Sequence, residues 1–244
     1  MKEISSINNE YIKYLYKLKE KKNRYNEGKF LIEGFHLVDE AYKSGSLIEV
    51  LTINEIPQYT DINQIKVTKG IIEKLSSTKN PQEIIGICEI KKNKQINGSR
   101  ILILDNVNDP GNMGTLIRSS LGFNIDTIIL SNDCVDIYNE KTIRATQGAI
   151  FKSNIYISDN LSETINQLKK KEIKIIGTSL TSSIDLKKIN DIDNYAVLLG
   201  NEAKGVKKEL LEVTDINVKI NMNAKLESLN VAVAGSIIMY YLSN

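Results

Sequence analysis

The second half of the chain alternates short apolar runs with polar segments of helical length, and this alternation restricts the folds open to it. We expect strands at 101–107, 127–131, 154–157, 174–178, 196–200 and 216–220. We expect helices at about 112–122, 139–146, 161–172, 207–213 and 228–242. Such alternation predicts a mostly parallel sheet with helices on both faces, and in such sheets ligands bind at the carboxyl ends of the strands.

The front of the chain has a smaller α/β pattern. Its expected strands are Phe30–Glu33, Ile48–Ile53, Ile65–Thr68 and Ile85–Ile90. Its expected helices are Tyr11–Asn23, Phe35–Ser44 and Gly70–Ser76. A polar, charged stretch that ends in glycine and serine follows, and we interpret 93–100 as a linker. The predicted domains are therefore 1–92 and 101–244.

Composition excludes several classes of site. The only cysteines, Cys88 and Cys134, are far apart, and His36 is the only histidine. A disulfide framework, a zinc site, a multi-histidine metal site and a histidine-based triad are therefore not expected. No run approaches the ~18 apolar residues of a membrane span, and no signal-peptide pattern follows Met1. We expect a cytoplasmic protein with reduced thiols and no metal.

Charge gives a weaker indication. The net charge is only +2, so binding of a nucleic acid would depend on a local basic patch. Seven basic residues lie between positions 13 and 29: Lys13, Lys17, Lys19, Lys21, Lys22, Arg24 and Lys29. A solvated helix face and an RNA-binding surface explain this crowding equally well.

Three motifs follow expected strands. The first, Asn106 to Arg118, contains Asp-Pro-Gly-Asn and predicts a tight turn that opens into a helix. The second is Leu198 to Gly205 and the third is Ile220 to Ala234. Together and in this order they resemble the signature of the SpoU/TrmH family of RNA 2′-O-methyltransferases, within the SPOUT superfamily. The resemblance covers Arg100 to Asn244 strongly and implies a trefoil knot, S-adenosylmethionine (SAM) as methyl donor, and no metal.

The resemblance also implies roles for single residues. Arg118 corresponds to the family's catalytic arginine, which is proposed there as the base. A guanidinium has a pKa above ~12 and loses protons poorly, so we expect it to bind the phosphate beside the target ribose. The other implied catalytic residues are Asn112, Glu202, Ser228 and Asn230. We expect Glu202 to orient Arg118 or residues across a dimer.

Helix capping is an alternative for three of these residues. Asparagine is a common helix cap, so capping alone would explain Asn112. Ser228 and Asn230 lie at the start of the last expected helix, where serine and asparagine are also favoured as caps. We favour capping for Ser228 over Asn230, which is expected further inside the helix. A salt bridge within the helix is the corresponding alternative for Arg118.

Backbone groups at strand ends would hold the methyl donor. Segment 177–180 and segment 200–202 offer such groups, and the resemblance implies apolar walls from the third motif. The expected donor-binding residues are Thr178, Ser179, Gly200, Asn201, Ile220, Met222 and Leu229. Two positions depart from the family pattern: Asn221 replaces a usual proline and Ala203 a common glycine. Because proline fixes φ, we expect Asn221 to loosen the donor loop.

The front of the chain resembles the family's RNA-binding accessory domain, through Lys29–Ala41 and Ser76–Gln82. Glu33 and Gly34 of this part are expected to be structural. The expected RNA contacts are Lys13, Lys21, Lys22, Arg24 and Arg144, and a structural role is equally open for Arg144. The accessory domain favours ribosomal RNA, most of all 23S rRNA, over transfer RNA. The resemblance further implies a homodimer that pairs through the last helix.

Two other functions remain open from sequence. One is an RNA-binding or ribosome-assembly factor that keeps the fold without catalysis, and the retained Asn112, Arg118, Glu202, Ser228 and Asn230 argue against it. The other is a nucleotide-dependent enzyme that uses the Asp-Pro-Gly-Asn turn to bind phosphate. It would need a Walker lysine or a dinucleotide-binding glycine pattern, and the sequence has neither.

Overall fold

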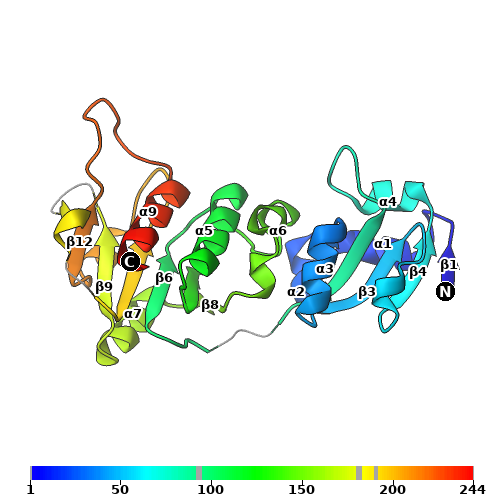
Figure 1. Ribbon diagram of the computed structural model, residues 1–244, viewed down its shortest axis with the longest axis horizontal. Coiled ribbons are helices and arrows are strands. Elements are labelled where there is room, and N and C mark those ends of the chain that lie inside the picture. Colours follow the sequence, from blue (N-terminus) through cyan, green and yellow to red (C-terminus); the bar gives the residue numbers. More distant parts are fainter. Residues whose placement is uncertain (1, 92–94, 180–182, 190–191, 244) are drawn as a thin grey trace. The chain divides into compact units, whose positions relative to one another are not determined.

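The computed structural model describes residues 2–91, 95–179, 183–189 and 192–243. Two compact units divide the chain (Figure 1). The first unit is 1–92 together with 136–152, and the second is 93–135 together with 153–244. The segment 136–152, which the sequence pattern places in the second domain, thus groups with the first unit.

The first unit is built on a five-stranded sheet of order β1-β4-β3-β5-β2. β4 runs parallel to β1 and β3, whereas β5 is antiparallel to β3 and β2. The strands are β1 (Lys2–Ile4), β2 (Lys29–Glu33), β3 (Leu47–Thr52), β4 (Asn63–Val67) and β5 (Ile84–Glu89). The helices are α1 (Glu10–Lys17), α2 (Lys21–Glu27), α3 (Phe35–Lys43), α4 (Lys69–Leu75) and α6 (Glu140–Thr146), with 3-10 turns η1 (Pro57–Tyr59) and η2 (Ala149–Phe151).

The helix expected over 11–23 is two helices. α1 ends at Lys17, and α2 begins at Lys21. The Arg24 guanidinium binds two backbone carbonyls between the helices: Nη1 donates to Leu18 O at 2.9 Å and to Lys19 O at 2.7 Å. These bonds satisfy carbonyls at the end of α1 that have no partner within a helix, and so stabilise the break between the two helices.

The second unit contains a seven-stranded sheet of order β10-β12-β9-β11-β6-β7-β8. Every neighbouring pair is parallel. The strands are β6 (Arg100–Leu104), β7 (Thr127–Ser131), β8 (Ile155–Ser158), β9 (Lys174–Thr178), β10 (Ile184–Asp185), β11 (Tyr195–Leu199) and β12 (Ile216–Lys219). The helices are α5 (Pro110–Gly122), α7 (Leu161–Lys170), α8 (Lys208–Leu211) and α9 (Val231–Ser243), with 3-10 turn η3 (Leu186–Lys188).

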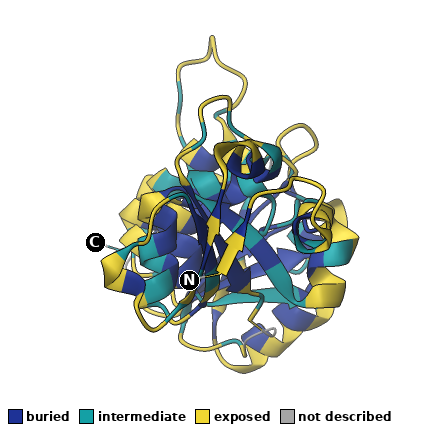
Figure 2. Ribbon diagram, turned by 90° about the vertical axis from the view of Figure 1, so that its right-hand side faces the viewer, coloured by how far each residue is buried: buried dark blue, intermediate teal, exposed yellow. Residues whose placement is uncertain are grey.

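Helices cover both faces of this sheet, which confirms the predicted α/β class. Ile101 and Ile103 of β6 pack with Ile165 of α7 and with Leu210 of α8. α9 packs closely on α5 and β11 over the other face, since a Cβ on Gly235 would lie 2.5 Å from a methyl of Leu199. Figure 2, which views the molecule from the side of the N-terminus, shows most strands buried and the surrounding helices with their exposed faces turned outward.

Two element boundaries differ from expectation at places that carry the motifs. β6 ends at Leu104 rather than at position 107, because Asp105 is bonded to the loop after β11 and Asn106 adopts a left-handed φ of 56°. α9 begins at Val231 rather than at 228. Within the described ranges, no helix is both long and apolar enough to pass through a bilayer.

Candidate active site

The first motif forms the entry to α5. The Asp109 side chain accepts a hydrogen bond from Asn112 N at 2.8 Å and caps the helix, with Pro110 in its first turn. Asn112 is therefore not the cap, contrary to the capping alternative. Its side chain is left to bond elsewhere.

Three side chains from three parts of the second unit form a hydrogen-bonded relay. Asn112 Nδ2 donates to Glu202 Oε1 at 3.0 Å, and Asn230 Nδ2 donates to Asn112 Oδ1 at 2.8 Å. An ionised carboxylate only accepts hydrogen bonds, so Glu202 fixes the orientation of the Asn112 amide. The relay thus joins the loop after β11 to the starts of α5 and α9.

Asn230 is also the cap of α9. Its Oδ1 accepts from Ala232 N at 2.9 Å and Val233 N at 3.3 Å. The Nδ2 group of the same amide donates to Asn112, so Asn230 caps α9 and belongs to the relay at the same time. The preference for Ser228 as the cap was wrong, because Ser228 is exposed and lies in the loop before the helix.

Arg118 is an exposed residue of α5. Among the contacts of the described residues, its guanidinium has no hydrogen bond and no ion pair, so the salt-bridge alternative does not hold. Glu202 does not orient Arg118 within one chain. It contacts Asn112 and the Asp109 N–H, the latter at 3.4 Å. An unpaired guanidinium on the same helix as a fixed amide relay is suited to binding an anion.

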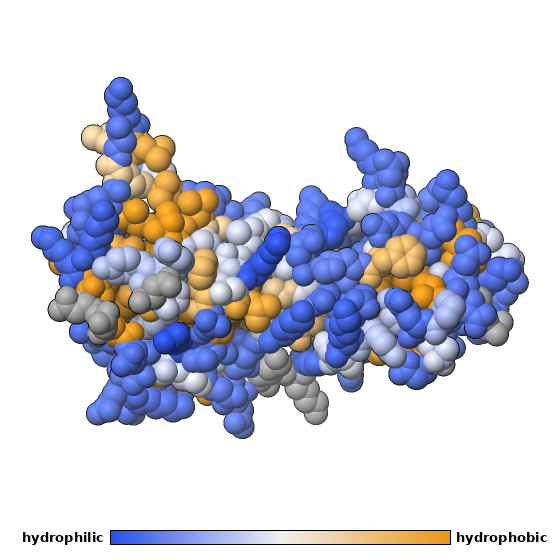
Figure 3. Space-filling model, in the orientation of Figure 1, coloured by the Kyte–Doolittle hydropathy of each residue, from blue (hydrophilic) through white to orange (hydrophobic). Residues whose placement is uncertain are grey.

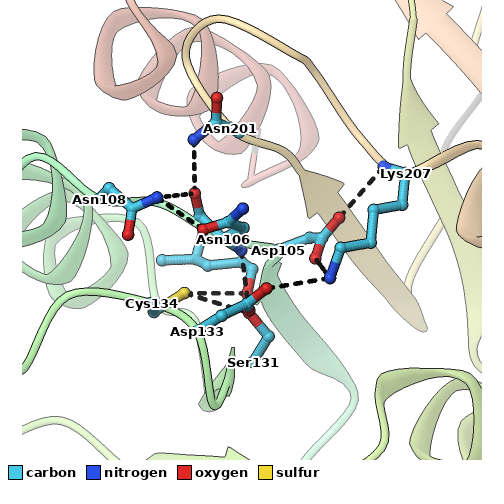
Figure 4. A network of polar contacts seen from close by, with 9 residues as sticks. Asp105, Asn106, Asn108, Ser131, Asp133, Cys134, Asn201 and Lys207 are labelled. Carbon is cyan, nitrogen blue, oxygen red and sulfur yellow. Dashed lines mark hydrogen bonds and ion pairs between the residues drawn. The ribbon is translucent and has the colours of Figure 1, made fainter.

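The loop after β11 is a tight turn. Asn201 and Gly205 exchange backbone hydrogen bonds of 3.0 and 2.9 Å. Gly200 permits this closure, because a Cβ there would lie 2.1 Å from Val206 N. The Asn201 side chain donates to Asn106 O at 2.9 Å, which ties this turn to the first motif (Figure 4).

A buried acid anchors the end of the same turn. Asp105 is completely buried, and its carboxylate accepts from Lys207 N at 3.1 Å and pairs with Lys207 Nζ at 3.1 Å. Lys207 Nζ also lies 3.1 Å from Asp133 Oδ2, as Figure 4 shows. The hydrogen bond to Asp133, aided by Asp105 and opposed by burial, raises the pKa of Lys207. Sequence reasoning missed Asp105 and Lys207, although an acid directly after a buried apolar strand was a usable signal.

The predicted donor loops share one edge of the sheet. β12, β9 and β11 are neighbours, so the residues after their carboxyl ends lie together. Thr178 Oγ1 donates to Leu198 O at 3.0 Å, and Ser179 N donates to Val218 O at 3.1 Å. Leu180 of the predicted segment lies outside the described residues.

The third motif is a largely exposed loop before α9. Ile220, Met222 and Leu229 are half-buried. Asn221 Nδ2 donates to Asp185 Oδ2 at 2.5 Å, and Asp185 Oδ1 accepts from Lys187 N at 3.0 Å. The expectation that Asn221 loosens this loop is therefore not met, because its side chain ties the loop to β10.

The residues of these three loops suit SAM. Backbone groups after three adjacent strands can bond the polar parts of the molecule, and half-buried Ile220, Met222 and Leu229 can contact its apolar parts. No cluster of three or more His, Cys, Asp or Glu side chains suited to a metal occurs among the residues that the structure describes.

The predicted RNA contacts of the first unit differ in exposure. Lys13, Lys21 and Lys22 are exposed, and Lys13 pairs with Glu10 at 2.7 Å. Arg24 is only 5% exposed and forms an ion pair with Asp136. Four of its five N–H groups are bonded to Asp136, Leu18 and Lys19, and the side chain is buried, so Arg24 is not available to a phosphate at the surface.

Arg144 and the loop after α4 lie together in the same unit. Arg144 Nη1 donates to Ser77 Oγ at 2.6 Å, and the guanidinium remains partly exposed. The Glu33 carboxylate accepts from Ser76 Oγ at 2.7 Å and from Ser77 N at 3.3 Å. Gly34 has a φ of 98°, which favours glycine. Glu33 and Gly34 are structural, as expected.

Comparison with known proteins gives consistent matches. The model of the SpoU rRNA Methylase family matches residues 99–240, and that of the MRM3-like substrate binding domain matches residues 9–86. The chain is 35% identical to the 23S rRNA (guanosine(2553)-2′-O)-methyltransferase RlmP of Bacillus subtilis, over 99% of each chain. It is 27% identical to a Putative TrmH family tRNA/rRNA methyltransferase of Staphylococcus epidermidis, over 86% of this chain and 93% of that protein.

Solved structures agree. The AdoMet-bound rRNA methyltransferase from Sinorhizobium meliloti superposes with a TM-score of 0.90 at 27% identity, over 99% of this chain and 97% of that one. The SpoU methyltransferase AviRb from Streptomyces viridochromogenes superposes with a TM-score of 0.88 over 97% of each chain. Its identity is 20%, so this second likeness concerns the fold alone.

Proposed function

Because the chain belongs to the SpoU rRNA methylase family, we propose that it transfers the methyl group of SAM to a ribose 2′-hydroxyl of 23S ribosomal RNA. The observation that carries this proposal is the relay of Glu202, Asn112 and Asn230 on the same unit as the unpaired Arg118. The relative of known activity, from Bacillus subtilis, methylates a guanosine 2′-oxygen of 23S rRNA by its name, which supports the substrate.

The mechanism needs alignment of the hydroxyl more than strong acid or base chemistry. When bound, SAM supplies a methyl group on a sulfonium, whose departure as a neutral thioether needs no metal. Arg118 binds the phosphate next to the target ribose and so places the 2′-hydroxyl. Asn112, held by Glu202 and Asn230, offers its remaining donor and acceptor capacity to the ribose.

Arg118 acts as an orienting group rather than as the base in this proposal. A guanidinium is a charged hydrogen-bond donor, and it stabilises the phosphate and the developing alkoxide without losing a proton. The proton then passes to solvent or to a phosphate oxygen. Ser228, on the exposed loop, joins the site from the third motif.

The two units divide the work. We assign RNA binding to 1–92 together with 136–152, and methyl transfer to the rest of 101–244, with 93–100 as the linker. The match of residues 9–86 to a substrate binding domain supports the first assignment. Exposed Lys13, Lys21 and Lys22 and the partly exposed Arg144 are the proposed phosphate contacts, whereas Arg24 serves the fold.

A homodimer that pairs through α9 completes the proposal. Val233, Ile237, Tyr240 and Tyr241 of this helix are between 37% and 60% exposed. Apolar surface gathers over the part of the second unit that carries α9 (Figure 3). Burial of such a face against a second copy would remove it from water. The loops after β9, β11 and β12 would form the trefoil knot, and a cytoplasmic location follows from the rRNA substrate.

The test is methyl transfer from labelled SAM to separated, unmodified 23S rRNA and tRNA. Label in 23S rRNA supports the proposal, and label in tRNA alone replaces its substrate by the alternative. SAM binding without transfer to either RNA, also with ribosomal subunits as substrate, favours a catalytically silent RNA-binding factor.

A further inference from the structure

Tyr16 of α1 is an exposed aromatic side chain with two ammonium groups beside its ring. Its exposed fraction is 47%. Lys19 Nζ lies 5.2 Å from the ring centroid, and Lys74 Nζ of α4 lies 5.9 Å from it. These distances are those of cation–π contacts. Residues far apart in sequence thus place two positive charges at one exposed ring.

Backbone carbonyls hold both ammonium groups in place. Lys19 Nζ donates to Ser76 O at 2.7 Å and more weakly to Lys74 O at 3.4 Å. Lys74 Nζ donates to Ile7 O at 2.7 Å. An ammonium has three donors, so each lysine keeps at least one for a ligand.

The two charges lack carboxylate partners among the described residues. The acids adjacent in sequence are engaged elsewhere: Glu20 accepts from Asn23 at 3.0 Å, and Glu73 lies 3.9 Å from Lys69. Two fixed and uncompensated cations attract an anion more strongly than mobile surface lysines, because less side-chain entropy is lost on binding.

We propose that Tyr16, Lys19 and Lys74 form a binding site for an unpaired RNA nucleotide. The ammonium groups bind its phosphate, and its base stacks on the Tyr16 ring. Cation–π contacts at an exposed ring are weak, so a base can replace them at the ring while the carbonyl bonds keep both ammonium groups beside it for the phosphate. Bases inside a duplex are already stacked, so the site selects single-stranded loops or bulges. This inference rests on RNA being the substrate.

Tyr25 offers a contrast. It is 40% exposed, and Lys21 Nζ lies 5.9 Å from its ring centroid. However, its hydroxyl donates to Asp136 at 3.1 Å, and its ring packs edge-on against Tyr138. Tyr25 therefore serves the packing of 136–152 in the first unit, and we do not include it in the site.

The experiment measures binding of the full chain to a single-stranded RNA oligonucleotide and to a duplex containing it, over a range of salt. Tyr16→Ala should weaken single-strand binding by about 5- to 100-fold and leave the salt dependence unchanged, because stacking is not ionic. Tyr16→Phe keeps the ring and should bind like the wild type. Lys19→Gln with Lys74→Gln should reduce the slope of log K against log salt by about 0.7 for each phosphate that the variant no longer neutralises.

Two controls keep these outcomes distinct. Lys66→Gln removes a lysine that pairs with Glu3 at 3.7 Å and should change binding little. Lys19→Arg with Lys74→Arg keeps both charges, which separates the loss of charge from damage to the fold. The proposal is overturned if Tyr16→Ala binds the single strand within twofold of wild type, or if it weakens duplex binding equally.

Failure of this inference is separable from failure of the proposed function. Methyl transfer to 23S rRNA by the wild type, with normal RNA binding by Tyr16→Ala, would refute the nucleotide site alone. Loss of RNA binding in Tyr16→Ala, in a protein whose wild type transfers no methyl group, would support the site and refute the reaction.

Discussion

Asn112 Nδ2 lies 3.0 Å from Glu202 Oε1, so an amide at the start of α5 is bonded to a carboxylate on the loop after β11. The same amide accepts from Asn230 at the start of α9. One asparagine thereby fixes the relative positions of all three sequence motifs. This cross-connection explains why residues so far apart in sequence act together.

Replacing Glu202 by alanine should release the Asn112 amide. We expect the single-turnover rate of methyl transfer to fall by about 100-fold, because a misplaced positioning group costs that much. SAM affinity should change little. Glu202→Gln can still accept from Asn112 and should lose less activity. Equal loss in both variants would show that the charge of Glu202, and not its hydrogen bond, matters.

Replacing Arg118 by alanine should lower methyl transfer by about 100- to 1000-fold while leaving SAM binding nearly intact, because the phosphate of the RNA loses its guanidinium. Rapid-quench assays with RNA in excess, together with calorimetric titration of SAM, separate the two effects. Arg118→Lys should recover only part of the rate, since an ammonium does not bind phosphate bidentately. Wild-type turnover in Arg118→Ala would refute the assigned role.

Replacing Asn221 by alanine should raise the dissociation constant of SAM by about three- to tenfold, because the loop before α9 loses its bond to Asp185 and spends less time in its binding conformation. Asn221→Pro should restore affinity by fixing φ instead. Titration calorimetry gives both values. Lys225→Ala, which removes an exposed side chain of the same loop that is not bonded to Asp185, is the control. An unchanged dissociation constant in Asn221→Ala would contradict this account of the loop.

Replacing Gly200 by alanine should destabilise the turn after β11. The added Cβ would lie 2.1 Å from Val206 N and 2.2 Å from the Gly205 carbonyl carbon, and backbone atoms cannot move aside cheaply. We expect a loss of about 1–3 kcal/mol in the free energy of unfolding, measured in urea, and weak SAM binding. Gly122→Ala is the matched control, since nothing lies within 4 Å of its Cβ position. Normal stability of Gly200→Ala would contradict the observed turn.

Stability should fall in acid partly through Asp133. Burial opposes its ionisation, but hydrogen bonds from Ser131 and Lys207 outweigh burial and lower its pKa below the ordinary 3.8. A depressed pKa in the folded state contributes stability above pH 3.8 that is lost as pH falls through the folded value. The pair is about half exposed, so its contribution is about 0.5 kcal/mol or less.

Melting temperatures of Asp133→Asn and wild type from about pH 2 to about pH 8 test this prediction. The variant should melt slightly lower near neutral pH, and the difference should vanish below the folded pKa. Asp159→Asn, whose acid accepts from the neutral Asn132 amide at 2.9 Å, is the control. A difference that grows on acidification would have the wrong sign for this ion pair.

Much of the fold could be predicted from sequence because apolar periodicity is local. The strands of both units lie within a few residues of their expected positions, and the family resemblance carried by the three motifs is confirmed by the match over 99–240. Short β1 and β10 were missed, since strands of three and two residues leave no periodic signal.

The site was less predictable where tertiary partners decide the outcome. Arg24 counts as one more basic residue in sequence, yet Asp136, more than a hundred positions away, holds it in the interior. In the sequence, Asn221 is notable only because the family usually has proline at this position. Its hydrogen-bond partner Asp185 cannot be identified from the spacing of residues along the chain. Local sequence patterns indicate the kind of role that a residue can have, but only the folded structure shows which residue it contacts.

The most direct test of the central claim is to identify the atom that becomes methylated. Unmodified 23S rRNA is incubated with SAM and with wild type or Arg118→Ala, digested to nucleosides and analysed by mass spectrometry. We predict one new ribose-methylated nucleoside with the wild type and almost none with the variant. A methyl group on a base, or equal ribose methylation by both proteins, would contradict the account.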